Sequence, residues 1–193
     1  RRAPDRHAWK RLRGILKQQR YDLVHAQFGQ AGLLPWPKRY PVVITFRGCE
    51  ILGVKGADAR TTTAGKILRR LCQITAKHAD AVIAVSDHMR SHIPASTPLY
   101  IIPSGLDFDA LPNLSQEEAR RQLGLPLDER LLLFVGDPAE ERKRYKLARQ
   151  AVEILNQTLP AKLIVGWDKH HSDILVMMNA CNALVFTSFQ EGS

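Results

Sequence analysis

Short apolar runs alternate with segments of helical periodicity along the whole chain. The clearest run is Leu131–Val135, whose five apolar residues predict a buried strand because they are too few for a core helix. Gly136 ends the run, a polar loop over 137–141 follows, and apolar residues then recur at helical spacing. The stretch 131–152 therefore predicts a strand, a glycine turn and a helix, which are half of a βαβ unit.

The same two patterns predict the remaining elements. Ser86 is expected to be the N-cap of a short helix, and Ser115–Glu118 is a capping box whose helix ends at Gly124. Because short connections join the strands and helices, the chain predicts an α/β fold with mainly parallel sheets and helices on both faces. The expected strands are 21–27, 41–46, 81–85, 99–102, 162–165 and 183–187, the longer helices are 4–19, 64–79 and 171–180, and 51–63 is expected to be a loop.

The chain length allows one large or two small domains. Residues 107–114 are loop-like and lead into the capping box, which makes this region the expected linker. We predict an N-terminal domain over 1–110, a linker with the capping helix over 111–128, and a C-terminal domain over 129–193.

Polar residues gather directly after the predicted strands. The carboxyl ends of parallel strands meet at one edge of a sheet, and ligands bind beyond that edge in open α/β sheets. Scattered loop polarity would explain two or three such clusters, so a larger number predicts a ligand cleft. The clusters are His25 with Gln27, Arg47 with Gly48, Ser86, Ser104 with Gly105, Gly136 to Lys143, and 188–193.

Three cations, Arg142, Lys143 and Arg144, open the predicted helix of the stretch 131–152. The first turn of a helix carries partial positive charge, so cations there oppose helix stability by a few tenths to ~1 kcal/mol each. A bound phosphate would reverse this, because it accepts hydrogen bonds from backbone amides and pairs with the cations. The alternative is a solvated charge run, balanced by the two glutamates before it, and the residues alone leave both interpretations open.

The net charge of +9 is concentrated at one end of the chain. Residues 1–20 hold eight lysines and arginines against one aspartate, whereas residues 21–193 hold 20 against 18 acidic residues. Residues 4–20 are thus basic and amphipathic, and they either pack as an ordinary surface helix or contact an anionic membrane from its inner side. The balanced charge elsewhere excludes a polyanion-binding surface along the whole protein, so we expect no nucleic-acid partner.

The spacing of the cysteines and histidines and the length of the apolar stretches exclude further classes of site and protein. Cys49, Cys72 and Cys181 are odd in number and far apart, which argues against a disulfide framework or a zinc site and for a reducing, cytoplasmic location. His88 and His92 are four residues apart with no third ligand nearby in the sequence, so no metal site is expected. No apolar stretch approaches the ~20 residues of a membrane span.

Six motifs, taken in their order and spacing, resemble glycosyltransferase family 4, the retaining group with a GT-B fold of two Rossmann-like domains. Each motif is generic by itself, but the resemblance covers nearly the whole chain. The motifs are VHAQFGQAGLL (24–34), VVITFRGCEI (42–51), ADAVIAVSDHM (79–89), IIPSGLD (101–107), LLLFVG with RKRYKLA (131–148), and MNACNALVFTSFQEGS (178–193).

The resemblance implies a donor site in the C-terminal domain. Lys143 matches the family lysine that grips the donor diphosphate. Asp137 stands where an arginine is usual, so that cation is absent or supplied by Arg142 or Arg144. Glu191 matches the first glutamate of the family signature, which contacts the donor sugar, and it is with Lys143 the expected catalytic residue. The implied donor-binding set is Gly136, Asp137, Arg142, Lys143, Glu191, Gly192 and Ser193.

On the acceptor side, the resemblance is looser. Arg47 stands where many members carry a histidine, and arginine can contact an anion but cannot carry a proton near neutral pH. His25 and Gln27 resemble a His-x-His pair whose second histidine is replaced, and Ser104 stands where asparagine is common. The expected acceptor or cleft residues are His25, Gln27, Arg47, Gly48, Ser86, Ser104 and Gly105.

The family implies retaining, metal-independent transfer of a sugar from a nucleotide-diphosphate sugar to a saccharide or lipid-linked acceptor, without a cofactor, in cell-surface polysaccharide or glycan biosynthesis. A nucleotide-sugar 2-epimerase, a sugar phosphorylase and a non-catalytic nucleotide-sugar-binding module stay open as alternatives. The glycine-rich first βα unit and the second signature glutamate of the family are not found in this sequence. We therefore expect an internal segment that is inactive by itself and prone to associate through exposed sheet edges.

Overall fold

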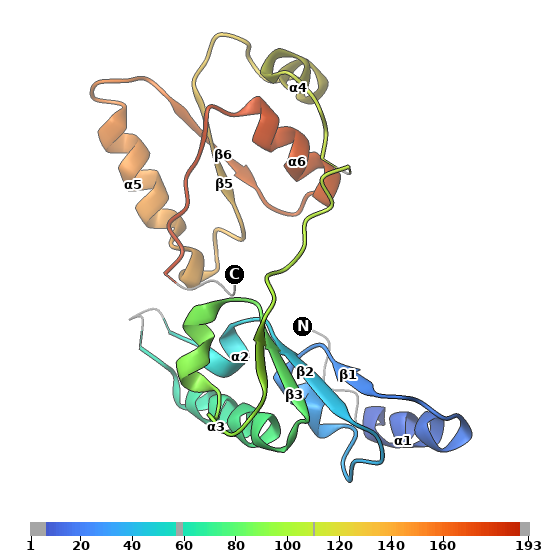
Figure 1. The fold of residues 1–193 in the computed structure, drawn as a ribbon. Helices are drawn as coiled ribbons and strands as arrows, with labels where there is room; N and C mark the ends of the chain where they lie inside the picture. Colours follow the sequence, from blue (N-terminus) through green and yellow to red (C-terminus); the bar gives the residue numbers. More distant parts are fainter. Residues whose placement is uncertain (1–6, 57–59, 110, 190–193) are drawn as a thin grey trace. The chain divides into compact units, whose positions relative to one another are not determined.

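The computed structural model describes residues 7–56, 60–109 and 111–189, which form two compact units (Figure 1). The chain passes from the first unit to the second between Ser104 and Gly105. Each unit is a parallel sheet with helices packed against it, so the predicted α/β class is confirmed.

The first unit contains a four-stranded sheet in the order β1-β2-β3-β4. All neighbouring strands pair in parallel, so their carboxyl ends share one edge. The strands are β1 (Val24–Ala26), β2 (Val42–Phe46), β3 (Ala81–Ala84) and β4 (Leu99–Ile101), and the helices are α1 (Ala8–Gln18), η1 (Gly29–Leu33), α2 (Cys49–Leu52), α3 (Thr63–His78) and η2 (Asp87–His92), where η marks a 3₁₀ helix.

The core of the first unit is built around β2. Four of its five residues are buried, as expected for a central strand of a parallel sheet, and Ile44 and Phe46 are fully buried. Gly29 lets η1 approach this core closely, since a Cβ at that position would lie 2.5 Å from both Cys72 Sγ and Phe46 Cε1. The close packing fixes the loops that follow β1 and β2.

The second unit contains a three-stranded parallel sheet in the order β6-β5-β7. Helix α5 lies on one side of the sheet, and α6 with α4 lies on the other (Figure 1). The strands are β5 (Leu131–Val135), β6 (Lys162–Gly166) and β7 (Ala183–Leu184), and the helices are α4 (Gln116–Leu123), η3 (Glu141–Lys143), α5 (Tyr145–Leu155) and α6 (His171–Ala180).

The predicted capping box begins α4. The Glu118 amide donates to the Ser115 hydroxyl, and the Ser115 amide donates back to the Glu118 carboxylate at 2.9 Å. At the other end Gly124 adopts a left-handed φ of 64°, which a glycine accepts without a steric penalty. Both ends of this helix are therefore where the sequence predicted them.

Helix α4 packs as part of the second unit. Ala119 is fully buried against α6, and Arg120 is only 3% exposed. The Arg120 guanidinium donates to the carbonyls of Ala180 at 2.9 Å and Leu127 at 2.6 Å, and to the Asn182 side chain at 2.9 Å. A buried cation with several acceptors fastens α4 to the segment that leads into β7.

Four local predictions differ from the structure. The expected loop over 51–63 begins inside α2, which continues to Leu52. Ser86 is the N-cap residue of η2, as predicted, but its hydroxyl hydrogen-bonds with Nδ1 of His88 at 2.8 Å and caps no backbone amide. Strand β1 covers only three of the seven residues predicted for it, and β7 covers only two of the five predicted at 183–187. Residues 4–6 of the predicted first helix lie outside the described residues.

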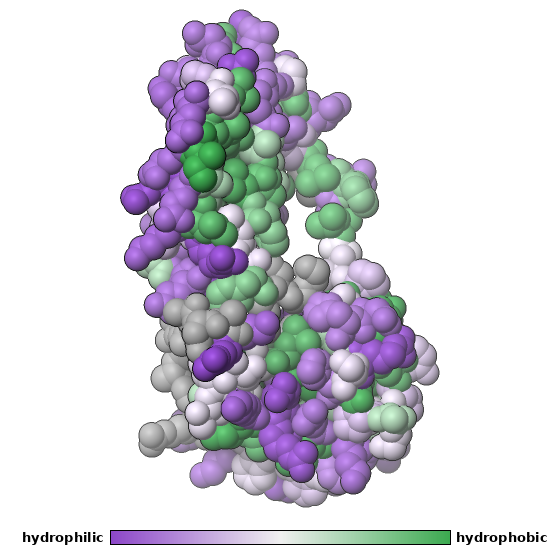
Figure 2. Space-filling view, turned by 90° about the vertical axis from the view of Figure 1, so that its left-hand side faces the viewer, coloured by the Kyte–Doolittle hydropathy of each residue, from purple (hydrophilic) through white to green (hydrophobic). Residues whose placement is uncertain are grey.

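Part of the second unit's surface is apolar. Figure 2 shows a strip of hydrophobic side chains on this unit between hydrophilic ones. Leu147 and Ile154 of α5 are among its exposed large apolar residues. Within the ranges the structure describes, no helix has the length and apolar character needed to cross a bilayer.

Candidate functional site

The carboxyl end of β5 places a lysine against a glycine. Gly136 follows the strand with φ of 138°, and a Cβ at this position would lie 3.1 to 3.2 Å from the Cγ, Cδ and Cε atoms of Lys143. The aliphatic stem of Lys143 therefore lies on the bare backbone of Gly136, where a larger residue would displace it. The structure thus brings together two of the residues predicted for the donor site.

The three cations after this strand do not open an α-helix. Arg142 and Lys143 lie in the 3₁₀ turn η3, Arg144 adopts a left-handed φ of 55°, and α5 begins at Tyr145. The ring of Tyr145 packs edge-on against Phe134 of β5, with ring centroids 5.1 Å apart, which anchors the start of α5. The prediction that these cations occupy the first helical turn is wrong, because left-handed Arg144 separates η3 from α5.

Hydrogen bonds within the loop shape the approach to η3. The Ala139 amide donates to the Asp137 carboxylate at 2.8 Å, and the Glu140 amide donates to the Asp137 carbonyl at 3.0 Å. Arg142 pairs with Glu140 at 3.1 Å. Asp137, which stands at the expected arginine position, therefore forms a turn that orders the loop.

The segment after β7 is bonded to the same turn. The Thr187 hydroxyl donates to the carbonyl of Lys143 at 2.8 Å and to that of Arg144 at 3.2 Å. The Phe189 amide donates to the Arg142 carbonyl at 3.4 Å. These bonds hold residues 187–189 beside η3. The remaining predicted donor residues, Glu191, Gly192 and Ser193, lie outside the described residues.

In the first unit, a chain of side chains links the ends of β1 and β2. His25 Nε2 hydrogen-bonds with the buried Thr45 hydroxyl at 2.7 Å, and the Gln27 amide lies 3.3 Å from His25 Nδ1. Arg47 donates to the Gln27 carbonyl oxygen at 2.8 Å. Three of the residues predicted for the acceptor side are thus in direct contact, and all three remain exposed at the surface.

Glu50 supports this cluster and was not predicted. It is 2% exposed, and its carboxylate accepts a hydrogen bond from the Arg47 backbone amide at 2.6 Å. Gly48, which lies between the two residues, has a φ of 140°. Burial, with the Glu50 carboxylate adding to it, raises the pKa of the Cys72 thiol to about 12, so Cys72 stays a neutral core residue. The three-residue spacing from Arg47 could have revealed Glu50, because acidic residues in a first helical turn often accept an amide just before the helix.

The other predicted cleft residues do not join this cluster. Ser86 follows β3 and is bonded to His88. Ser104 and Gly105 are exposed and stand at the boundary between the two units. The described contacts therefore give these residues no partner within the His25 cluster.

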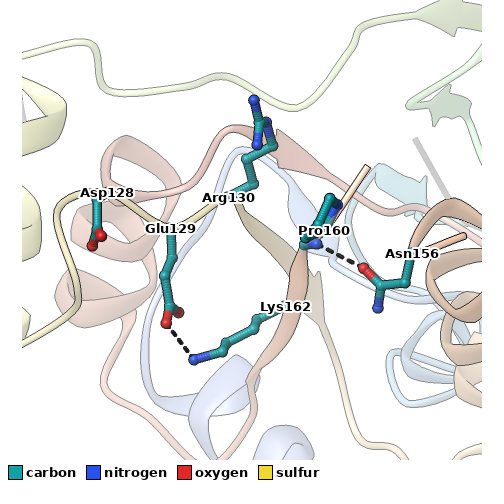
Figure 3. Close-up of a pocket in the computed structure, with 7 residues that line it drawn as sticks. Asp128, Glu129, Arg130, Asn156, Pro160 and Lys162 are labelled. Atoms are coloured by element: carbon teal, nitrogen blue, oxygen red, sulfur yellow. Dashed lines mark hydrogen bonds and ion pairs between the residues drawn. The ribbon is translucent and has the colours of Figure 1, made fainter. Parts of the chain in front are cut away.

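A cavity of about 400 Å³ lies at the opposite end of the second sheet (Figure 3). Its walls are 128–130, which precede β5, and Asn156 with 160–162, which precede and begin β6. The Lys162 ammonium pairs with Glu129, and the Ala161 amide donates to Asn156 Oδ1 at 2.6 Å. Because the strands are parallel, this cavity is at their amino ends, away from Gly136 and Lys143.

Comparison with known proteins decides the family. The sequence model of the family described as Glycosyltransferase Family 4 matches residues 1–110. The chain belongs to glycosyltransferase family 4. A curated relative, a D-inositol 3-phosphate glycosyltransferase of Nocardiopsis dassonvillei, is 31% identical over an alignment of 159 positions that covers 76% of this chain and 37% of that protein. This family 4 chain therefore spans well under half the length of that relative.

Solved structures share the fold of this family 4 chain. A sucrose-phosphate synthase from Thermosynechococcus elongatus superimposes with a TM-score of 0.71 at 17% identity, covering 100% of this chain and 58% of that one. Anabaena HepE, solved in complex with UDP-glucose, gives a TM-score of 0.62 at 18% identity, covering 93% and 56%. The predicted GT-B fold is thereby confirmed, and so is the family to which the sequence motifs pointed.

Proposed function

We propose that the protein containing this chain transfers a sugar from a nucleotide-diphosphate sugar to an acceptor, and that the turn around Lys143 binds the donor diphosphate. The observation that carries this proposal is the contact of the Lys143 stem with Gly136 at the carboxyl end of β5. That edge is where open α/β sheets bind their ligands. Membership of the family and the UDP-glucose complex of HepE support a nucleotide sugar as the donor.

The charge arrangement suits the chemistry of glycosyl transfer. The reaction breaks a glycosyl phosphate bond through an oxocarbenium-like transition state, and negative charge grows on the leaving diphosphate. The Lys143 ammonium then stabilises the transition state more than the bound donor. Helix α5 begins two residues later without a side-chain cap, so its first amides add partial positive charge at the same edge.

Glu191 is the proposed partner of Lys143 and orients the donor sugar. Phe189 is bonded to the turn that holds Lys143, and two residues of extended chain span at most about 7 Å. In this proposal the Glu191 carboxylate accepts hydrogen bonds from hydroxyls at the sugar end of the bound donor. The amides of Gly192 and Ser193 complete the proposed donor site.

The acceptor side of the proposal is the cluster of His25, Gln27 and Arg47. Its exposed imidazole, amide and guanidinium groups offer hydrogen bonds to a saccharide or to the head of a lipid-linked acceptor. We further propose that the transfer retains the anomeric configuration, requires no metal and serves the synthesis of a cell-surface polysaccharide or glycan.

A transfer assay on the full-length protein tests the proposed function. Labelled UDP-, GDP- and ADP-sugars are offered with saccharide and lipid-linked acceptors, with and without EDTA. A glycosylated acceptor of retained configuration, formed equally in EDTA, is the expected product. An isomerised donor would instead identify a 2-epimerase, and a released sugar phosphate would identify a phosphorylase. Donor binding without turnover would identify a binding module, the alternative that Asp137 and Arg47 favour by departing from the family pattern.

A further inference from the structure

We propose that α1 attaches the first unit to an anionic bilayer surface through a cationic face formed by Lys10, Arg13 and Lys17. The inference concerns attachment, and it holds whether or not the proposed transfer reaction is correct.

Helix α1 turns its apolar side into the first unit. Leu16 is 7% exposed, and Leu12, one turn earlier, is half-buried. The Trp9 indole donates to the Trp36 carbonyl at 3.0 Å, and the Tyr40 hydroxyl donates to the Leu16 carbonyl at 3.3 Å. These contacts fix the rotation of the helix about its axis, so the same residues always face outward.

The outward side is cationic and hollowed. Lys10, Arg13 and Lys17 recur every three or four residues, which aligns them on one face, and with Trp9 and Gly14 they line a hollow of about 380 Å³. Nothing lies within 4 Å of a Cβ added at Gly14. Packing therefore does not explain a glycine in the middle of a helix, where it is less stable than alanine. The missing side chain leaves room for an anionic headgroup to approach the backbone between the cations.

These cations also lack acidic partners. Some basic side chains elsewhere in the described residues are in ion pairs, such as Lys38–Asp80 and Arg149–Glu153. No such pair between described residues involves Lys10, Arg13 or Lys17, and α1 itself contains no acidic residue. Arg13 instead lies over the Trp9 ring, 4.6 Å from its centroid. The charge of this face is therefore available to an external anion.

The features beside the cations favour a bilayer over a nucleic acid. Trp9 is 40% exposed and borders the cationic face, since it lines the same hollow as Lys10, Arg13 and Lys17. Tryptophan is enriched at the level of lipid headgroups, where one end of the side chain contacts apolar acyl chains and the other contacts water. Basic residues also exceed acidic ones over residues 21–104, by 10 to 5, so duplex DNA is the competing anion that the test must include.

Vesicle flotation of the full chain tests this proposal. The vesicles contain phosphatidylcholine alone or phosphatidylcholine with about a third phosphatidylglycerol. The test variant is Lys10→Gln/Arg13→Gln/Lys17→Gln. Its matched control, Lys66→Gln/Arg70→Gln/Lys77→Gln on α3, removes the same charge from the same unit. We expect the wild type and the control to bind the anionic vesicles but not the neutral ones. The test variant should bind the anionic vesicles about 100-fold more weakly, because each cation near an anionic leaflet raises the binding affinity roughly fivefold.

Several results would overturn the proposal. They are no vesicle binding, equal binding to neutral vesicles, equal loss in the two triple variants, and a preference for duplex DNA over anionic vesicles at the same ionic strength. Thermal unfolding followed by circular dichroism shows whether each variant is folded. Should the triple variant unfold, the single reversal Lys17→Glu, with Lys66→Glu as its control, keeps the test decisive, because only the first should weaken anionic binding.

Discussion

The two units form the carboxyl edges of their sheets by different means. In the first unit, side chains bond to side chains, as Arg47 does to Gln27. In the second, the backbone sets the geometry: Gly136 takes a φ of 138° under the Lys143 stem, and the Thr187 hydroxyl bonds to the carbonyls of the turn. A network of side chains can change with one substitution, whereas a turn defined by backbone conformation tolerates few. We infer that the second unit carries the more constrained half of the function, binding of the diphosphate.

The largest effect is expected where the backbone conformation itself is changed. In Gly136→Val, the new side chain meets the Lys143 stem and imposes about 1–3 kcal/mol of strain at a φ of 138°. We predict that the affinity of the full-length protein for its nucleotide-sugar donor falls about 100-fold, measured by titration calorimetry.

The control for this substitution is Gly124→Ala. Gly124 also has a left-handed φ, of 64°, but a Cβ there has nothing within 4 Å. This variant should lose about 1 kcal/mol of unfolding free energy and retain its donor affinity. Equal losses of affinity in both variants would show that strain in general, and not displacement of Lys143, is responsible.

A smaller effect is expected where a side chain only supports the turn. Thr187→Val removes the hydroxyl that donates to the carbonyls of Lys143 and Arg144. With each hydrogen bond contributing about 1 kcal/mol, donor affinity should fall roughly fivefold to tenfold. Thr158→Val is the matched control, since the Thr158 hydroxyl bonds to the Leu155 carbonyl at the end of α5. Unchanged affinity in the Thr187 variant would mean that the turn holds its shape without this bond.

The smallest effect is expected on the acceptor side. Arg47→Gln removes an exposed guanidinium whose partner is the exposed Gln27 side chain, so stability should change by less than ~1 kcal/mol. We predict an unchanged KM for the donor and an acceptor KM raised about threefold in steady-state kinetics. A loss of donor affinity in this variant would contradict the division of roles between the units.

The sequence predicted best the elements that depend on local pattern. Strand β5 spans Leu131–Val135 and helix α6 spans His171–Ala180, both with the predicted bounds, and the capping box of α4 is present. Each of these is encoded within its own residues, by an apolar run, a helical period or a pair of capping side chains. The motifs likewise place Lys143 and Gly136 in one predicted site, and the two residues are in contact in the structure.

The features that were missed depend on contacts between distant residues. Arginine rarely adopts a left-handed φ, so the residue type of Arg144 does not predict one. The Arg144 carbonyl accepts a hydrogen bond from Thr187, which lies 43 positions away in the sequence. The hydroxyl of Ser86 bonds to the ring of His88 in preference to a backbone amide, and periodicity cannot reveal that choice. Glu50 is buried because α2 packs on α3, which the pattern of its own residues does not show.

The most direct test of the account is nucleotide binding by two lysine variants of the full-length protein. Titration calorimetry compares Lys143→Ala with Lys146→Ala, three positions on and exposed in the first turn of α5, against UDP, GDP and ADP. The account predicts that the wild type and Lys146→Ala bind one of these nucleotides alike, and that Lys143→Ala binds it at least about tenfold more weakly, as expected for loss of a charged hydrogen bond. Equal affinity in all three proteins would contradict the claim that Lys143 holds the donor diphosphate.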